Sequence, residues 1–217
     1  MHSWRLLQVA DSAFPTGGFI HSGGLEAAAQ LGLVDRTCLT DWLQEAIEAF
    51  VHGALPLVTA AHQTPERLVE LDALAEAWLW NAAANRASRA QGQGWLATAH
   101  AAFPEAGLDT VRQHLRQQAS PMHQAPVLGV ILARLDLPVE DARRLALFLH
   151  LRALLSAAIR LGLVGPLEAQ GIQARLGPAL DAALDRTIGL DDMSTTAPLA
   201  ELAHLHHDRL YSRLFAT

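Results

Sequence analysis

Two pairs of adjacent glycines, Gly17-Gly18 and Gly23-Gly24, enclose His21 and Ser22 near the start of the chain. Glycine adopts positive φ angles without steric cost and lets another backbone approach closely, so this spacing predicts a tightly shaped loop at the entrance of a helix. A loop of this kind can bind a phosphate, support a serine nucleophile, or contact another protein.

The phosphate-binding interpretation fails at both positions that a P-loop requires. Gly18 and Gly23 have the separation of the two P-loop glycines, but Gly24 and Leu25 follow where that motif needs Lys and then Ser or Thr. All sixteen basic side chains are arginines, so no lysine elsewhere can supply the missing ammonium. The dinucleotide fingerprint is excluded as well, because no strand is expected before the glycines and no Gly-x-Gly-x-x-Gly is present.

The serine-nucleophile interpretation rests on Ser22 beside His21. A nucleophile elbow needs a glycine two residues before the serine, where this chain has Ile20, and a preceding strand, where it has a helix-like run. Both requirements fail, so the sequence favours a loop that packs or docks.

A histidine cluster occurs near the end of the chain. Along the expected last helix, His204, His207, Asp208 and Tyr211 share one face at i, i+3, i+4 and i+7. Two histidines with an aspartate could hold Zn²⁺ or Ni²⁺, but no cysteine or second pair with metal-ligand spacing accompanies them. We therefore expect no metal site and one core histidine, His206. A histidine-based nickel site is the alternative.

An arginine seam follows Pro138, where the longest helix is expected to begin. That helix is apolar almost all round, which predicts a central position, yet Arg152, Ser156 and Arg160 fall on one side of it at i, i+4 and i+8. A buried arginine needs partners. The seam therefore predicts either a surface edge or an internal ion pair, or else a contact with a partner protein or a second subunit.

The overall composition limits the classes of function. Of 217 residues 51% are hydrophobic, and the net charge is −6, which argues against nucleic acid and membranes as partners. Cys38 is the single cysteine and cannot form an internal disulfide. We expect a cytoplasmic protein, since the N-terminus also lacks the features of a signal peptide.

Helix-forming residues dominate the chain, and only 6% of residues are aromatic. We expect one all-α domain over residues 1–217, a bundle of about eight to ten helices with the long apolar helix at its centre. Further helices are predicted over residues 85–103, 127–135 and 167–184, and from Pro198 onward. An interior glycine costs a helix about 1 kcal/mol relative to alanine, so Gly92 and Gly94 predict close helix approach.

Several blocks of residues resemble one known family. The first is LLQVADSAFPTGGFIHSGGLEAA at residues 6–28, and it is followed in order by Arg86-x-Ser88 with Gly92, APVLG at residues 125–129, Ala158-x-Arg160-Leu161, and Arg213-Leu214-Phe215. Together they resemble the urease accessory protein F family over essentially the whole chain. His21 stands where many members have Tyr, and Gly23 where Gln or a bulkier residue is common, so details of the loop's contacts differ.

The resemblance implies an all-α, non-catalytic protein that helps to load nickel into urease and has no cofactor of its own. Implied partners are a second urease accessory protein of the UreD or UreH type, a nickel-carrying GTPase of the UreG type, apo-urease, and a second copy of the chain. The residues expected to contact partners are Pro15, Gly17, Gly18, Phe19, His21, Ser22, Gly24, Glu26, Arg160, Arg209 and Arg213.

Three functional hypotheses follow from the residues and the resemblance. The first is an adaptor that brings the GTPase to apo-urease. The second is a regulator of that GTPase, in which Arg160, Arg209 or Arg213 enters the active site as arginine fingers do. The third is a metallochaperone that binds nickel through the histidine cluster.

Overall fold

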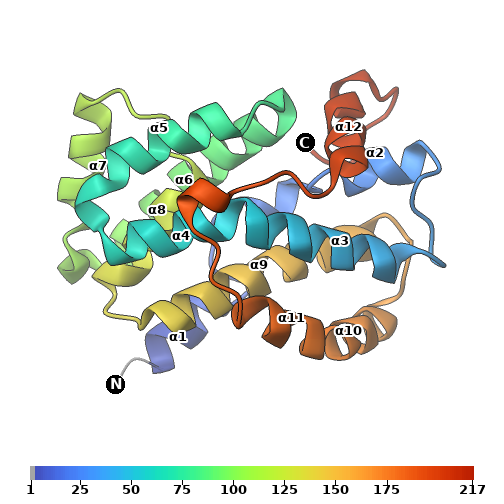
Figure 1. Cartoon of the computed structure of the whole chain (residues 1–217), viewed down its shortest axis with the longest axis horizontal. Coiled ribbons are helices and arrows are strands. Elements are labelled where there is room, and N and C mark those ends of the chain that lie inside the picture. Colours follow the sequence, from blue (N-terminus) through green and yellow to red (C-terminus); the bar gives the residue numbers. More distant parts are fainter. Residues whose placement is uncertain (1–2) are drawn as a thin grey trace.

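Segments rich in Ala and Leu form α-helices throughout the computed structural model, which describes residues 3–217 (Figure 1). The α-helices are α1 (Ser3–Ala10), α2 (Leu25–Gln30), α3 (Leu39–His52), α4 (Ala54–Gln63), α5 (Leu68–Trp78), α6 (Ala82–Ala102), α7 (Leu108–Gln117), α8 (Gln124–Arg134), α9 (Val139–Arg160), α10 (Pro166–Arg175), α11 (Gly177–Leu184) and α12 (Pro198–Leu205). Short 3-10 helices are η1 (Gly18–Ile20), η2 (Pro65–Arg67), η3 (Pro104–Ala106), η4 (Leu190–Asp192) and η5 (His206–Arg209). The predicted all-α class is confirmed, since no strand occurs within this range.

The described residues contain more α-helices than the eight to ten expected, because local sequence divides some segments. The predicted helix over residues 167–184 is two helices, α10 and α11, which meet at Leu176 and Gly177. Pro178 lies in the first turn of α11, where its missing amide hydrogen costs no hydrogen bond. A proline is favoured at such a start and disfavoured inside a continuous helix.

Helices α4, α8 and α9 pack together in the middle of the molecule (Figure 1). Gly129 lets α8 approach α4 closely, because a Cβ atom built there would lie 2.4 Å from the carbonyl oxygen of Val58 in α4. The hydrophobic core extends from Val9 in α1 to Phe215 near the C-terminus, so both ends of the described chain contribute to it. None of the helices in residues 3–217 has the length and apolarity needed to cross a membrane.

Helix α9 carries the arginine seam, and the seam faces the N-terminal part of the same chain. Arg152 donates a hydrogen bond to the carbonyl oxygen of Ala10 at the end of α1, and Arg160 donates to the carbonyl oxygen of Phe19. Ser156, between them, is exposed. The two guanidinium groups thus hold the N-terminal segment against α9.

The interior glycines of α6 admit connecting loops rather than neighbouring helices. A Cβ atom at Gly92 would lie 1.9 Å from the carbonyl oxygen of Met122, and one at Gly94 would lie 2.4 Å from that of Thr16. Helix α6 also binds the N-terminal loop that contains Thr16, because Thr98 Oγ1 donates a hydrogen bond to the carbonyl oxygen of Pro15 at 2.7 Å. The N-terminal loop is therefore seated on α6.

A buried carboxylate, Asp72 of α5, organises the loop before α8. It is fully buried and accepts hydrogen bonds from the amides of Met122 at 2.8 Å and His123 at 2.6 Å, and from the hydroxyl of Ser120. These bonds hold Met122 at a φ of 65°, an unusual conformation for a residue with a side chain. The loop's shape therefore depends on a residue about fifty positions earlier.

The last helix is shorter than predicted, and the expectation for its faces was wrong. Helix α12 ends at Leu205, and a 3-10 turn and an extended tail follow. His206 is exposed and His207 is fully buried, which reverses the predicted assignment of the core histidine. The chain continues from α12 into the local hydrogen bonds of η5, and the tail beyond it bonds to distant residues, as described below.

The close approach of the Met122 backbone to Gly92 generates a stability prediction. We expect Gly92→Ala to lower the free energy of unfolding by about 3 kcal/mol, because the new methyl group would overlap the backbone of Met122. Gly171→Ala in α10 is the matched control, since its methyl group would meet only the flexible side chain of Arg175 at 3.4 Å, and we expect it to be neutral or slightly stabilising. Urea unfolding followed by circular dichroism measures both; equal stabilities of the two variants would contradict the packing described for α6.

His150 in α9 generates a prediction for pH dependence. Its ring is buried and stacks on Phe50 with centroids 4.5 Å apart, and burial lowers its pKa to about 4. Between about pH 6.5 and pH 4, His150 is protonated in the unfolded chain but neutral in the folded chain. The folded state therefore loses stability as pH falls through this range. We expect His150→Leu to remove about 2 kcal/mol of the stability loss between pH 7.5 and pH 5. Unfolding titrations at both pH values test this, with the exposed His206→Leu as control; parallel losses in all three proteins would contradict it.

Candidate partner-binding site

The double-glycine loop is shaped by three left-handed glycines. Gly17, Gly23 and Gly24 have φ angles of 77°, 60° and 87°, and the last of them immediately precedes α2. At Gly24 both conformation and space require glycine, because an added Cβ atom would also lie 3.0 Å from the Cβ atom of His204. The loop and α12 are therefore in backbone-to-side-chain contact.

The inner side of this loop binds the C-terminal tail of the chain, residues 210–217. The amide of Ala216 donates to the carbonyl oxygen of Ile20 at 2.8 Å, and the amide of Ser22 donates to the carbonyl oxygen of Thr217 at 2.7 Å. The Ser22 hydroxyl donates to the same carbonyl at 3.1 Å, and His21 Nδ1 lies 2.6 Å from the Thr217 hydroxyl. Ser22 is 1% exposed, so its hydroxyl serves packing rather than nucleophilic attack.

Glu26 in the first turn of α2 anchors the tail from the other side. Its carboxylate accepts hydrogen bonds from the amide of Leu214 at 2.6 Å and that of Phe215 at 3.1 Å. His207 Nε2 donates to the same carboxylate at 3.3 Å. Glu26 is 1% exposed and its first-turn position suits the positive end of the helix dipole. One buried carboxylate thus joins the loop, η5 and the tail.

Arg160 completes this arrangement, which we call the C-terminal clasp and define as residues 18–26, Arg160, and residues 206–217. Its guanidinium carbon lies 4.2 Å from the ring centroid of Phe19 and 4.2 Å from that of Phe215. Phe215 is buried, whereas Phe19 remains 68% exposed. The clasp therefore holds a large aromatic side chain at the surface in a fixed position.

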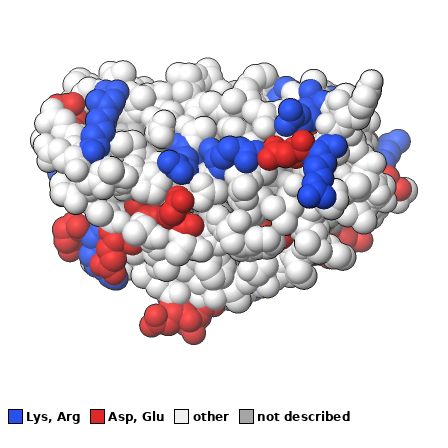
Figure 2. Space-filling model, turned by 90° about the horizontal axis from the view of Figure 1, so that it is seen from above, with Lys and Arg blue, Asp and Glu red and all other residues white. Residues whose placement is uncertain are grey.

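A network of charged side chains covers the outside of the clasp. Arg86 of α6 donates both of its hydrogen bonds to the two oxygens of Asp208 at 2.7 Å, and Arg213 lies 3.6 Å from the same carboxylate. Hydrogen bonding by Arg86 lowers the pKa of Asp208, so the carboxylate stays ionised. On the face above α5, α6 and α12, basic side chains form a row that acidic ones interrupt (Figure 2). Arg209 is also exposed.

The histidines do not assemble the alternative nickel site. His207 points to Glu26, while Asp208 is bound by Arg86 and Arg213 on the surface. Burial, and then the nearby His207, lowers the pKa of His21; burial, with His207 and His21, lowers that of His204 to about 4. Within residues 3–217 no group of three His, Cys, Asp or Glu side chains has a geometry that could hold a metal ion.

The structure brings together most of the residues that the sequence singled out. Phe19, His21, Ser22, Glu26 and Arg160 meet in the clasp. Gly24 is buried within the clasp, Gly18 is half-buried, and Arg209 and Arg213 are exposed on it. Pro15 and Gly17 are exposed just before the clasp begins. The role of Thr217 and of the Leu214 amide was not foreseen, because backbone groups leave no signal in a sequence.

The blocks of the family resemblance explain part of what the sequence missed. Arg86 contacts Asp208 of the clasp, Ser88 Oγ lies 3.1 Å from both His123 Nδ1 and the Gln124 amide, and Gly92 admits the same loop. The spacing of Arg86-x-Ser88 and Gly92 therefore reflects two separate contacts of one helix.

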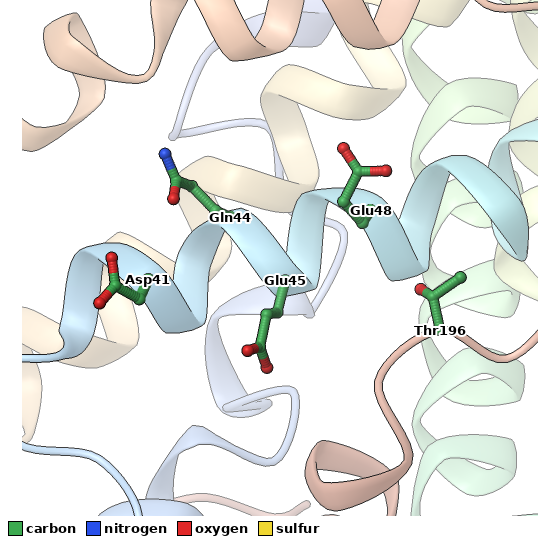
Figure 3. Close-up of a pocket in the computed structure, with 5 residues that line it drawn as sticks. All are labelled: Asp41, Gln44, Glu45, Glu48 and Thr196. Carbon is green, nitrogen blue, oxygen red and sulfur yellow. The ribbon is translucent and has the colours of Figure 1, made fainter.

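A surface pocket elsewhere in the molecule lacks converging groups. It measures about 400 Å³ and is lined by Asp41, Gln44, Glu45 and Glu48 of α3 together with Thr196. Glu45 points away from Glu48, as Figure 3 shows, and Glu48 is bound by Arg186 at 2.8 Å. The clasp remains the candidate site.

The loop geometry generates a prediction for three substitutions. We expect Gly24→Val to lower the free energy of unfolding by about 3 kcal/mol, because a β-branched residue is strained at this positive φ and would press on His204. Gly18→Val would meet mainly the flexible end of Gln91, and Ser22→Ala would lose one hydrogen bond, so each should cost about 1 kcal/mol. Thermal unfolding of the three variants measures the order; a Ser22→Ala variant less stable than Gly24→Val would contradict it.

Comparison with known proteins places the chain in one family. The family model described as UreF matches residues 33–177. "Urease accessory protein F" of Oryza sativa subsp. indica is 34% identical over 221 residues, which cover 99% of this chain and 85% of that protein. The protein of the same name from Arabidopsis thaliana is 34% identical over 99% of this chain and 92% of its own length. "Urease accessory protein UreF" of Rhodopseudomonas palustris (strain BisB5) is 32% identical, covering 98% and 90% respectively. The chain therefore belongs to the UreF family of urease accessory proteins, whose members are not enzymes.

Proposed function

We propose that the chain acts in the maturation of urease by nickel insertion, as a non-catalytic adaptor. In this proposal it bridges a second urease accessory protein of the UreD or UreH type and the nickel-carrying GTPase of the UreG type, in a complex with apo-urease. The observation that carries the proposal is similarity to urease accessory proteins over nearly the full chain. Nickel is the cargo of this process rather than a cofactor of the chain.

The position of the clasp supports contact with partners. Three blocks that carry the family resemblance, around Phe19, Arg160 and Phe215, are distant in sequence and touch one another in the structure. Their common surface exposes an aromatic ring and several arginines, the residue types that dominate binding energy in protein interfaces. Because Arg160 holds Phe19 against the fold, little conformational entropy would be lost when a partner covers that ring.

Regulation of the GTPase is a finer part of the proposal. Arg160 is engaged with two aromatic rings and a carbonyl oxygen, whereas Arg209 and Arg213 are exposed. An arginine that stabilised transition-state charge in the GTPase would therefore come from the tail or η5. Comparing GTP turnover with the wild-type chain, Arg209→Ala and Arg213→Ala separates regulation from scaffolding alone, because an adaptor can act without changing the turnover rate.

The assembly state and cellular location complete the proposal. We propose a homodimer, in line with the family resemblance, that works in the cytoplasm. The half-buried, unpaired Cys38 supports a reducing compartment, since disulfides are rare there. The net charge of −6 supports protein partners rather than nucleic acid or membranes.

Complementation of a deletion strain tests the adaptor function. We expect cells without the chain to make urease polypeptide that has little activity at limiting nickel, and the wild-type gene to restore activity. Arg213→Ala and Phe19→Ala should restore less, and the corresponding purified proteins should co-elute poorly with the GTPase and the second accessory protein. Arg116→Ala, on the polar helix α7, is the control for loss of an exposed arginine and should behave as wild type.

The readouts of this test are urease activity, urease polypeptide and complex formation from the same cultures. Normal activity in the deletion strain at limiting nickel would refute a role in maturation. Full restoration by both clasp variants would instead move the partner-binding surface away from the clasp while leaving the role in maturation intact.

A further inference from the structure

We propose that Glu26 is a positioning residue for partner binding: its buried carboxylate fixes Arg213, and through Asp208 the Arg86–Asp208–Arg213 network, in the orientation that a partner recognises. This inference rests on the proposed adaptor function and assigns the cause of the clasp's shape to one side chain. The partner surface that the network fits is an acidic patch on a protein, because two arginines share one carboxylate there and leave a net positive charge.

The first step is that Glu26 cannot reach a partner itself. It is 1% exposed and lies beneath the tail whose amides it binds. Any effect of Glu26 on complex formation must therefore pass through the residues that it holds.

The second step is that Glu26 holds the backbone directly beside Arg213. The bonded amides belong to Leu214 and Phe215, the next two residues in the chain. Two adjacent amides on one carboxylate fix both the position and the direction of the backbone. The Arg213 side chain therefore extends along the surface toward Asp208. Tyr211, Ser212 and Leu214 are exposed, so beside Arg213 the backbone depends on these two bonds and on the one that Gln30 donates to the carbonyl oxygen of Ser212 at 3.0 Å. The remaining tail bonds lie farther along, at residues 216 and 217.

The third step concerns the cost of releasing the tail. A buried carboxylate is stable only while hydrogen-bond donors surround it, and Glu26 has three: two tail amides and His207 Nε2. Detaching the tail would break two charge-assisted hydrogen bonds at once and leave the amides of Leu214 and Phe215 and the carboxylate to water. The two bonds to the Glu26 carboxylate therefore favour the closed clasp.

A double-mutant cycle tests the inference with Glu26→Gln and Arg213→Ala. The glutamine keeps the size of the side chain but replaces one acceptor oxygen with an NH₂ group that faces a donor. We expect Glu26→Gln to speed hydrogen exchange at the amides of Leu214 and Phe215 about tenfold or more, and to weaken binding to the purified GTPase with the second accessory protein about tenfold. In the Arg213→Ala background, the same change should weaken binding less than about twofold further, because the arginine through which it acts is gone.

The matched control is Asp72→Asn. Asp72 is also a buried carboxylate that binds two adjacent backbone amides, but it lies under the loop before α8. We expect Asp72→Asn to lower stability without changing hydrogen exchange at Leu214 and Phe215, and any effect of it on binding should add to that of Arg213→Ala. A non-additive result at Glu26 with an additive one at Asp72 distinguishes positioning from a general loss of stability.

A truncation provides the second variant if Glu26→Gln does not fold. Removing residues 214–217 leaves Glu26 and Arg213 in place but deletes both amides, and we expect it to bind the GTPase as weakly as Arg213→Ala. Wild-type binding by the folded truncation would overturn the inference, as would unchanged exchange at Leu214 and Phe215 in folded Glu26→Gln, or additive effects in the cycle.

The failure of the inference and that of the proposed function have different signatures. If Glu26→Gln frees the tail while Arg213→Ala still binds as wild type, the clasp is not the partner surface and the inference fails with it. If Arg213→Ala weakens binding and Glu26→Gln does not, the partner surface stands and only the positioning role is overturned.

Discussion

The carboxylate of Glu26 joins the start of α2 to residues near the C-terminus. A buried charge requires hydrogen-bond donors, and here the donors come from η5 and from the tail, more than 180 positions away. Because that requirement is met, the tail lies in the double-glycine loop, Phe215 is buried against Arg160, and Phe19 is held at the surface. The shape of the candidate site depends on this one interaction more than on the packing of any single helix.

The core provides a rigid support for the clasp through close backbone contacts. Glycines at 92, 94 and 129 each admit a carbonyl oxygen where a methyl group would overlap it. Two of these contacts lie on α6, which carries both the N-terminal loop and Arg86 of the surface network. A protein whose task is to present a surface gains from such contacts, since little of the partner's binding energy is then needed to order that surface.

The buried histidines beside the clasp illustrate why residue type alone does not define a metal site. His207 is close enough to His21 and His204 to lower the pKa of each, yet the nearest carboxylate already binds two amides and a ring nitrogen. A ligand set needs side chains that converge on one point with lone pairs to spare. The geometry of the described residues uses those groups for the fold instead.

The sequence by itself determined the features that depend on local patterns. The all-α class, the long helix after Pro138 and the tight turns at Gly17, Gly23 and Gly24 follow from composition, periodicity and the spacing of glycines. The family follows from blocks of residues that resemble its known members. Only the tertiary structure decided what fills the loop, because the bond between Ser22 and Thr217 spans 195 positions and leaves no local signal. It also decided that α12 ends at Leu205 and that the arginine seam of α9 faces the N-terminal segment. For the loop and the seam, the deciding contact is a hydrogen bond to a distant backbone carbonyl oxygen, whose position no local pattern of residues encodes.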